Sequence, residues 1–387
     1  MRKIKVMTVF GTRPEAIKMA PLVKALENCE YIDSQVCVTA QHRQMLDQVL
    51  EIFRIQPDYD LNIMQDRQTL IDITTRAIEG LHGVFTETEP DIVLVHGDTT
   101  TTFAASLAAF YARVKVGHVE AGLRTYDKYS PYPEEMNRRL TGAIADLHFA
   151  PTVANRENLL KENISGDAIY ITGNTVIDAL SSTVVSGYNF TDSFLREFSF
   201  ENKRVILVTA HRRENLGEPF ENIFTALRQL ADDVPDVNII YPVHLNPVVR
   251  EAAGRILGNH DRIHLIEPLN VQDMHNLMEK STLIMTDSGG IQEEAPALGK
   301  PVLVLRNETE RPEAIKAGTV KLAGTQRDAV YREARLLLDD AEEYQRMARS
   351  VNPYGDGHAS KRIVEAILYY FGLKNGRPEE FAVEHRS

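Results

Sequence analysis

The sequence predicts an α/β fold with two doubly wound, Rossmann-like domains, and three observations support this prediction. Short apolar, β-branched runs alternate with longer amphipathic segments along the chain, as in parallel sheets that are covered by helices on both faces. The strand-like runs form two series, and a polar stretch at residues 181–202 separates them. The chain has 387 residues, which is more than one hydrophobic core usually serves.

The first series of predicted elements fills the N-terminal half of the chain. Runs of branched apolar residues predict its strands, and a helical period predicts the segments between them. The join between the domains is expected near residues 173–178, after the last of these strands. The predicted strands are 4–10, 35–39, 92–96, 115–119, 147–150 and 169–172, and the predicted helices include 16–28 and 100–113.

The second series follows the same alternation of strand and helix. Its predicted strands are 204–209, 238–242, 263–266, 283–286 and 302–305, with helices at 220–230 and 328–339. Residues 361–371 have the pattern of an amphipathic helix, and the tail from Lys374 is polar. In open sheets of this kind, ligands bind outside the carboxyl ends of the strands, so the residues that follow each strand are the candidates for function.

The composition disfavours several classes of binding partner. A net charge of −12 disfavours nucleic acid and anionic membranes, because both require broad positive fields. The two cysteines, Cys29 and Cys37, provide neither a disulfide framework nor metal-ligand spacing. The N-terminus runs straight into a strand pattern, and no apolar run approaches roughly 18 residues. We therefore expect a cytoplasmic protein with no membrane span, no signal peptide and no bound metal.

Two familiar nucleotide motifs are missing from the sequence. No strand is followed by G-x-G-x-x-G, and no G-x-x-x-x-G-K-[ST] occurs, so neither a tightly bound dinucleotide cofactor nor a P-loop is expected. Asp58-Tyr59-Asp60 has the acidic spacing of metal-dependent glycosyltransferases. It follows Pro57 in a polar stretch, and we interpret it as a surface loop.

The stretch after the predicted strand 283–286 indicates an anion-binding site. Ser288, Gly289 and Gly290 stand between this strand and a helical pattern, so backbone N–H groups and a helix N-terminus point to one place, where a phosphate binds well. Glu294 lies near the first turn of that helix, within reach of ribose hydroxyls beside the phosphate. The alternative is an ordinary tight turn with an acidic helix start.

Cations and carboxylates gather at the same ends of the predicted strands. Arginines and lysines can hold a diphosphate together with a helix N-terminus and without a metal. Converging carboxylates push their pKa values apart and can stabilise positive charge on a sugar ring. The combination predicts a nucleoside-diphosphate sugar, with the phosphates on the second domain and the sugar against the first. The cations are Arg13, Lys18, His211, Arg212, Arg213 and Arg311, and the carboxylates are Asp98, Glu120 and either Glu134 or Glu135.

Each candidate also has a purely structural interpretation. Asp98 precedes a run of threonines and is a candidate helix N-cap. Glu134 and Arg138 have the i, i+4 spacing of a surface pair. Glu120 follows a buried strand, and His211 can be a turn histidine. His42 and His244 are interpreted as structural rather than catalytic.

Seven motifs in one order resemble the non-hydrolysing UDP-N-acetylglucosamine 2-epimerases of bacteria. They run from residue 10 to about residue 325, so the resemblance covers nearly the whole chain. The motifs are FGTRPEAIK at 10–18, HGDT at 96–99, HVEAGLR at 118–124, PEEMNR at 133–138, TAHRREN at 209–215, DSGGIQEEA at 287–295 and ERPEA at 310–314.

The resemblance implies a glycosyltransferase-B-type fold, in which the C-terminal helix returns to the first domain and a central cleft separates the domains. Residues 1–173 and 360–387 would form the N-terminal domain and residues 174–359 the UDP-binding domain. The implied reaction interconverts UDP-N-acetylglucosamine and UDP-N-acetylmannosamine through elimination of UDP to 2-acetamidoglucal and its re-addition. No redox cofactor is needed. A homodimer and a role in cell-surface polysaccharide synthesis are also implied.

The resemblance assigns a role to each matching residue. Asp98, Glu120 and Glu134 would be the acid, base and charge-stabilising carboxylates, and His211 would assist at the diphosphate. Glu294 would bind the ribose. The other substrate-binding residues would be Arg13, Lys18, Arg138, Ser288, Gly289, Gly290 and Arg311, with Leu269 and Met274 along the uracil through their backbone. A second, regulatory site for UDP-N-acetylglucosamine would be lined by Gln41, His42, Gln44 and Arg67.

Three other functions fit the same fold. A glycosyltransferase would use the UDP site to pass the sugar to an acceptor, but one catalytic base would then suffice. A hydrolysing epimerase would release UDP and free N-acetylmannosamine. A UDP-sugar sensor without catalysis would not need the three carboxylates.

Overall fold

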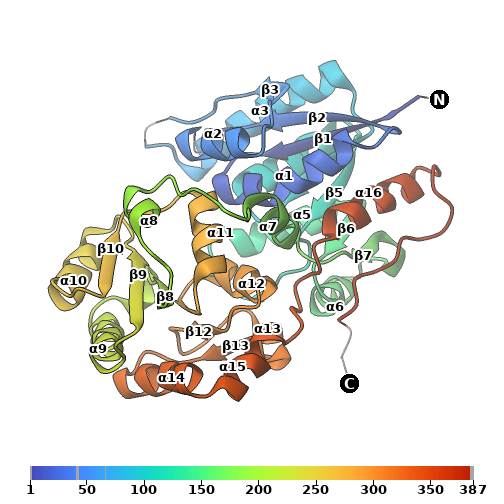
Figure 1. Cartoon of the computed structure of the whole chain (residues 1–387). Helices are drawn as coiled ribbons and strands as arrows, with labels where there is room; N and C mark the ends of the chain where they lie inside the picture. The colour runs from blue at the N-terminus through green and yellow to red at the C-terminus, as the bar shows by residue number, and fades with distance from the viewer. Residues whose placement is uncertain (1, 41–42, 66, 384–387) are drawn as a thin grey trace. The chain divides into compact units, whose positions relative to one another are not determined.

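The computed structural model describes residues 2–40, 43–65 and 67–383, which fold as two α/β units (Figure 1). The first unit comprises the residues up to Ser182 together with Tyr354–Ala382, and the second comprises Thr183–Pro353. The chain therefore passes between the units twice. The sequence placed these crossings at 173–174 and 359–360, before α7 (Thr175–Thr183) and at the start of α16 (Ala359–Tyr370).

A buried carboxylate explains why most of α7 belongs to the first unit. Asp178 of α7 accepts hydrogen bonds from the backbone N–H groups of Ala359 and Ser360, at 3.1 and 2.7 Å. These groups belong to the first turn of α16, whose N–H groups have no partner within the helix. The contact joins the outgoing and returning segments within one unit, and α16 packs on α1 (Arg13–Glu27) as the predicted return helix.

The first unit contains a seven-stranded parallel sheet in the order β3-β2-β1-β4-β5-β6-β7. Its core has two faces, because alternate residues of β1 point to opposite sides: Val6 and Phe10 join one cluster, and Met7 and Val9 join the other. The strands are β1 (Ile4–Phe10), β2 (Ile32–Val38), β3 (Tyr59–Asp60), β4 (Ile92–His96), β5 (Lys115–Val119), β6 (Leu147–Ala150) and β7 (Ile169–Ile171). The remaining helices are α2 (Arg43–Ile52), α3 (Leu70–Thr88), α4 (Thr100–Tyr111), α5 (Glu134–Ile144) and α6 (Val153–Lys161).

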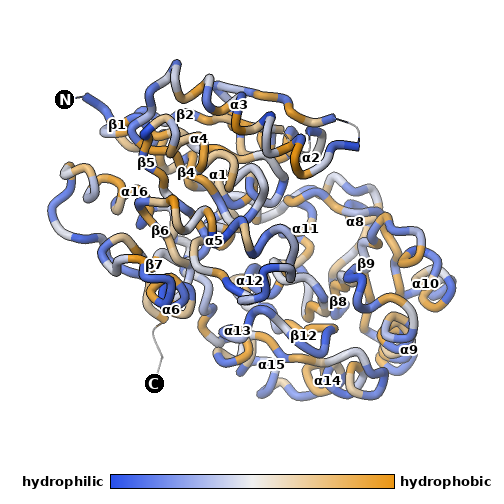
Figure 2. The backbone as a smooth tube through the Cα atoms, turned by 180° about the vertical axis from the view of Figure 1, so that it is seen from behind, coloured by the Kyte–Doolittle hydropathy of each residue, from blue (hydrophilic) through white to orange (hydrophobic). Residues whose placement is uncertain are grey.

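The second unit contains a six-stranded parallel sheet in the order β10-β9-β8-β11-β12-β13. The strands are β8 (Arg204–Thr209), β9 (Val237–Pro242), β10 (Ile263–Ile266), β11 (Leu283–Thr286), β12 (Val302–Val304) and β13 (Val320–Leu322). The helices are α8 (Ser193–Glu197), α9 (Glu218–Asp233), α10 (Pro247–Leu257), α11 (Val271–Lys280), α12 (Gly289–Ala297), α13 (Pro312–Ala317), α14 (Arg327–Asp339) and α15 (Ala341–Ala348). Figure 2 shows apolar and polar stretches alternating along the outer helices, as expected for helices that bury one face.

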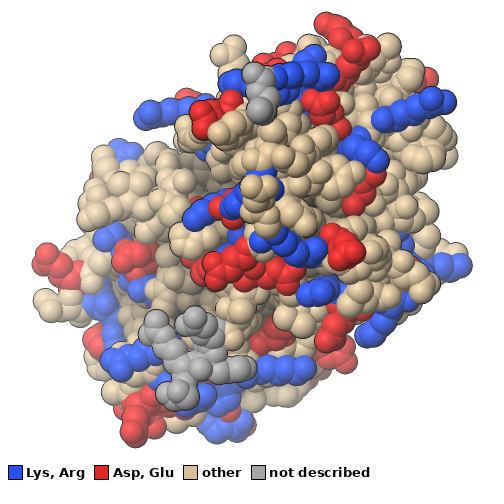
Figure 3. All heavy atoms as spheres, turned by 90° about the vertical axis from the view of Figure 1, so that its right-hand side faces the viewer, with Lys and Arg blue, Asp and Glu red and all other residues tan. Residues whose placement is uncertain are grey.

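The predicted pair of doubly wound sheets is therefore confirmed, and each predicted strand has a counterpart. The interpretation of Asp58–Asp60 as a loop is wrong at Tyr59 and Asp60, which pair with Cys37 and Val38 as edge strand β3. A strand of two residues is too short to show a period of two. No helix in the described part of the chain is long and apolar enough to cross a bilayer. On the face in Figure 3, basic and acidic side chains are interspersed.

The loop after β5 is packed tightly against α6. Gly122 has a φ of +95°, and a Cβ built on it would overlap the carbonyl oxygen of Asn155. Asn158 of the same helix donates from Nδ2 to the Gly122 carbonyl oxygen at 3.0 Å. Arg124 then forms two hydrogen bonds of 2.8 Å with Glu162 beyond the end of α6. The backbone between Glu120 and Arg124 is thus held in one conformation.

We expect Gly122→Ala to lower the free energy of unfolding by about 3 kcal/mol, because the methyl group adds a backbone clash to the strain of a positive φ. Gly372→Ala is the matched control, since Gly372 has a φ of +72° in the same unit and open space around it. It should lower the stability by only about 1 kcal/mol. Urea unfolding followed by circular dichroism measures both, and equal losses would contradict the proposed clash.

Candidate functional site

One buried carboxylate joins two loops at the carboxyl edge of the first sheet. Glu15 accepts hydrogen bonds from the backbone N–H groups of Gly11 and Thr12, at 3.1 and 2.8 Å. It also accepts from the hydroxyls of Thr99 and Thr102, at 2.6 and 3.2 Å. The first pair belongs to the loop after β1, and the second pair belongs to the start of α4. Glu15 therefore fixes the loop that leads into Arg13 relative to the loop that carries Asp98.

Glu120 lies at the end of β5 in a strained backbone position, with a φ of +61°. Its carboxylate pairs with the amine of Lys18, accepts from Asn174 Nδ2 at 3.0 Å and lies 3.4 Å from His96 Nε2. Burial alone would raise the pKa of Glu120, but the charge of Lys18 and the contact with His96 hold it well below its ordinary value. Glu120 is therefore a charged group in a water-poor place, as expected for a functional carboxylate.

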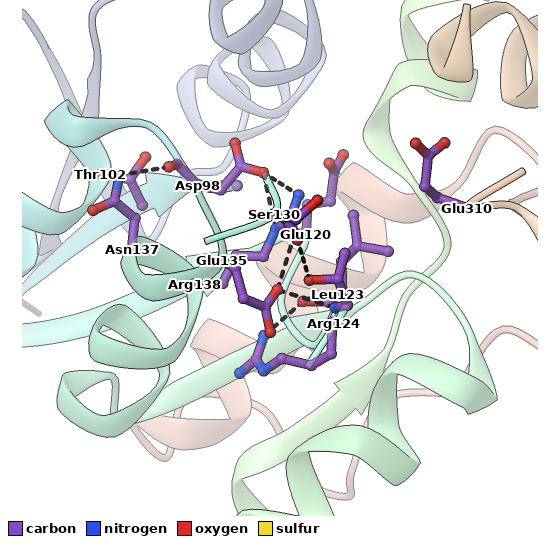
Figure 4. Close-up of polar contacts among 12 residues, drawn as sticks. Asp98, Thr102, Glu120, Leu123, Arg124, Ser130, Glu135, Asn137, Arg138 and Glu310 are labelled. Carbon is purple, nitrogen blue, oxygen red and sulfur yellow. Dashed lines mark hydrogen bonds and ion pairs between the residues drawn. The ribbon is translucent and has the colours of Figure 1, made fainter. Parts of the chain in front are cut away.

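Asp98 is held by Arg138, which reaches it from α5 (Figure 4). Arg138 Nε and Nη2 donate to the same carboxylate oxygen of Asp98 at 2.9 and 2.6 Å. Arg138 Nη1 donates to buried Glu135 at 3.2 Å, and Asn137 Nδ2 donates to the Asp98 carbonyl at 2.9 Å. The side chains of α5 thus orient Asp98, which remains 29% exposed.

These contacts decide between alternatives that the sequence left open. Asp98 is not the N-cap of α4, because Thr99 holds that position and accepts from the Thr102 backbone N–H at 3.1 Å. The surface pair of Glu134 and Arg138 is also wrong, since Arg138 pairs with Asp98 and Glu135.

Glu134 and Glu135 differ sharply in their surroundings. Glu135 is fully buried and accepts from the backbone N–H groups of Thr125 and Tyr126, each at 3.1 Å, so it holds the preceding loop. Glu134 begins α5 and is half-buried. Arg13, at the first position of α1, is half-buried too. Of the two glutamates, Glu134 is the one whose position suits contact with a ligand.

In the second unit, Asp287 organises the loop after β8. It is fully buried, and its Oδ2 accepts from the backbone N–H groups of His211 and Arg212 at 2.8 Å each and from Asn215 Nδ2 at 3.1 Å. Its Oδ1 lies 3.4 Å from Nδ1 of the His211 ring, which stacks on His244. Burial lowers the pKa of His211; Asp287 opposes this shift, and His244 and Arg212 add to it.

The N-terminus of α12 has the features of an anion site. Ser288 is its N-cap and makes no side-chain capping bond. The guanidinium groups of Arg212 and Arg311 both reach within 3.8 Å of the point where a Cβ of Gly289 would lie. Buried Glu293 binds Arg311 Nε and so fixes that guanidinium. Gly289 leaves space in which a phosphate can approach the helix N–H groups and both arginines.

Glu294 lies one turn into α12, with its Oε2 at 3.4 Å from Nε2 of buried His275. The predicted uracil segment leads into α11. Leu269 in this segment is buried and Met274 is half-buried, which fits contacts through the backbone better than through exposed side chains. These residues belong to one unit with Ser288, Gly289, Gly290 and Arg311.

The structure describes two of the four predicted regulatory residues, Gln44 and Arg67. Gln41 and His42 lie outside the described residues, and for Gln44 in α2 only the backbone is described. Arg67 is exposed and has a φ of +56°. Among the described residues, no group of three or more His, Cys, Asp or Glu is arranged to hold a metal ion.

Comparisons with known proteins identify the family. A family model for UDP-N-acetylglucosamine 2-epimerase matches residues 24–368. The chain belongs to this family. A UDP-N-acetylglucosamine 2-epimerase of Bacillus subtilis is 62% identical over 381 residues, covering 98% of this chain and 99% of that protein.

Solved structures of 2-epimerases share the fold. A crystal structure of a UDP-N-acetylglucosamine 2-epimerase aligns with a TM-score of 0.92 and 59% identity, covering 99% of this chain and all of that one (100%). The UDP-GlcNAc 2-epimerase of Neisseria meningitidis, solved with UDP-GlcNAc, aligns with a TM-score of 0.86 and 53% identity over 95% of this chain and 100% of that one. The predicted family and the glycosyltransferase-B-type fold class are confirmed.

Several residues that shape the site of this 2-epimerase family member were missed from sequence. Glu15 carried a signal, because Thr12 and Glu15 have the T-x-x-E spacing of a capping box, which the structure contains. Asp287 stands directly before the predicted phosphate loop, yet nothing in the sequence links it to the loop 75 residues earlier. His275 has no local signal, since its partner Glu294 lies on the next helix.

Lys18→Met should lower the free energy of unfolding by about 3 kcal/mol at pH 7, because it leaves Glu120 charged and buried. Glu120 has a depressed pKa, so its pair stabilises the fold above about pH 4.3, the ordinary glutamate value, and loses this effect as the pH falls through the folded pKa. The deficit of the variant should therefore persist from pH 7 to about pH 4.3 and shrink as the pH falls below that value towards the folded pKa.

The matched control is Lys115→Met, which breaks an exposed pair with Asp146 in the same unit (2.8 Å, with Lys115 50% exposed). It should lower the stability by less than about 1 kcal/mol. Chemical denaturation at several pH values compares the two variants, and a pH-independent deficit for Lys18→Met would refute the role given to the ion pair.

Proposed function

We propose that this protein interconverts UDP-N-acetylglucosamine and UDP-N-acetylmannosamine by inverting C2 of the sugar. The observation that carries the proposal is the match at 62% identity, over nearly the whole chain, with a protein named as a UDP-N-acetylglucosamine 2-epimerase. The contacts around the strand ends of each unit supply groups suited to each part of such a substrate.

The second unit would bind UDP. The N-terminus of α12 with Arg212 and Arg311 would receive the diphosphate, because both guanidinium groups and the open helix end surround Gly289. His211 would donate to a phosphate oxygen from its place against Asp287. Glu294 would bind ribose hydroxyls, and the backbone near Leu269 and Met274 would lie along the uracil. The relative from N. meningitidis was solved with UDP-GlcNAc.

The first unit would act on the sugar. The C2 proton has no neighbouring carbonyl to make it acidic, so departure of UDP leads: the C1–O bond breaks with its electron pair on the phosphate oxygen. The C2 proton then passes to a carboxylate and a C1=C2 bond forms, giving 2-acetamidoglucal. Charged Glu120 would stabilise the oxocarbenium-like transition state. Re-addition delivers a proton to the opposite face of C2 and returns UDP to C1.

The roles of individual groups follow from their surroundings. Lys18 was assigned to the phosphates and pairs with Glu120 here, so we propose that it keeps Glu120 charged. Arg138 would orient Asp98, and Glu134 would contact the sugar directly. Arg13 would add a positive charge at the start of α1.

Further properties that the resemblance implies for this protein stay predictions. They are a homodimer, a cytoplasmic location, activation by UDP-N-acetylglucosamine at a second site, and supply of cell-surface polysaccharide synthesis. We propose the division of labour by domain, with catalysis in the first unit and UDP binding in the second.

Incubation with UDP-N-acetylglucosamine in deuterated water should place deuterium at C2 while the UDP-sugar stays intact, because the proton exchanges with solvent on the enzyme. NMR follows the C2 signal and the appearance of UDP-N-acetylmannosamine. Free UDP with free N-acetylmannosamine would instead establish a hydrolysing epimerase. An unchanged substrate would contradict the proposal and favour a transferase or a sensor.

Asp98→Asn, Glu120→Gln and Glu134→Gln should each lower the rate at least about 100-fold while UDP still binds, since these groups act mainly in the transition state. Glu157→Gln, at an exposed position of α6, is the control and should leave the rate unchanged. Steady-state kinetics measures the rate, and calorimetric titration measures the binding of UDP. Near-normal turnover by all three variants would remove these carboxylates from the mechanism.

A further inference from the structure

A chain of buried polar side chains leads from the first residue of the second unit to Glu294. The hydroxyl of Thr183 lies 2.6 Å from Nδ1 of His275, and Nε2 of the same ring lies 3.4 Å from Oε2 of Glu294. Thr183 is fully buried and His275 is 2% exposed. A buried imidazole with partners at both nitrogens has a defined orientation.

The chemistry of the partners selects the tautomer of His275. A carboxylate only accepts hydrogen bonds, so Nε2 carries its proton towards Glu294. Nδ1 is then an acceptor, and the Thr183 hydroxyl donates to it. The contact with Glu294 at one nitrogen and the contact with Thr183 at the other together fix the ring and its tautomer.

Thr183 is itself held in place from α11. Asn276, the residue after His275, donates from Nδ2 to the Thr183 carbonyl at 2.8 Å and accepts from the Val185 backbone N–H at 3.0 Å. The contact with Thr183 is buried and the contact with Val185 is part-buried, and both lie at the start of the second unit. The hydroxyl that orients His275 is thus fixed before any ligand binds.

The two carboxylate oxygens of Glu294 have different neighbours. Oε2 faces His275, whereas Oε1 lies 3.4 Å from the point where a Cβ of Gly290 would be, over the first turn of α12. The contact with His275 therefore sets the rotation of the carboxylate and presents Oε1 at the helix end where the anion site lies. A carboxylate that rotates freely would order itself only when ligand binds, at an entropic cost.

We propose that His275 is a positioning residue that gives this protein its selectivity for a ribose, by orienting Glu294 towards the nucleotide hydroxyls. The proposal rests on the proposed function, in which Glu294 binds the ribose. His275 does not touch the ligand, and it acts through Glu294.

The test compares UDP with 2′-deoxy-UDP and 3′-deoxy-UDP by calorimetry, using the full chain. Wild-type protein should prefer UDP over at least one deoxy analogue by about 10- to 100-fold, as for a hydrogen bond to a charged group. His275→Asn keeps a partner for Thr183 but cannot reach Glu294, and its preference should fall to within about threefold. His275→Gln places an amide N–H near the position of Nε2 and should retain most of the preference.

A purely structural role would weaken all three nucleotides equally and leave their ratio unchanged in both variants, which would overturn the proposal. If His275→Asn does not fold, Thr183→Val tests the same point, because it removes the hydroxyl that selects the tautomer and should reduce the ratio. Glu294→Gln separates the positioning role of His275 from ribose binding by Glu294. Loss of the preference in Glu294→Gln but not in the His275 and Thr183 variants overturns the inference alone, whereas an unchanged preference in Glu294→Gln overturns ribose binding by Glu294.

Discussion

The buried carboxylate of Glu15 is the interaction on which the functional edge of the first unit depends. Loops at the carboxyl ends of parallel strands expose backbone N–H groups that no strand can pair. Glu15 satisfies two of them, at Gly11 and Thr12, and takes the hydroxyl of Thr99 from the neighbouring loop. The position of Glu15 in the first turn of α1 lets the helix dipole stabilise its charge. Glu15 thereby joins the segment that precedes Arg13 to the segment that follows Asp98.

In the second unit, a buried aspartate joins two loops as Glu15 does in the first unit. Asp287 follows β11 directly and accepts the backbone N–H groups of His211 and Arg212. An apolar side chain at this position would leave buried donors without a partner, which is expensive in a low-dielectric interior. Each sheet therefore has a buried acid that holds the loops of two neighbouring strands together. Such acids are expected wherever a site is built from separate strand ends.

The sequence predicted the sheets well because buried parallel strands are continuous apolar runs, and β1, β4, β5 and β6 have the predicted bounds. The edge strands β3 and β13 were missed, since two or three residues show no period. The site residues were predicted to lie at strand ends for the same topological reason. Their pairing was not predictable: Lys18 and Glu120 are 102 residues apart, and the choice of Glu120 as partner depends on side-chain rotamers that no local pattern encodes.

Anion recognition by a chain of net charge −12 depends on where cations are held rather than on how many there are. Arg311 donates a hydrogen bond from Nε to buried Glu293, and Arg311 Nη2 lies near Gly289. Glu293 neutralises part of the charge of Arg311. It also fixes the guanidinium before a ligand arrives, so less conformational entropy is lost on binding. Ser288 makes no side-chain cap at the start of α12, so the helix dipole adds to the attraction for an anion there. A compact diphosphate can reach both features, whereas the net negative charge of the chain disfavours extended polyanions.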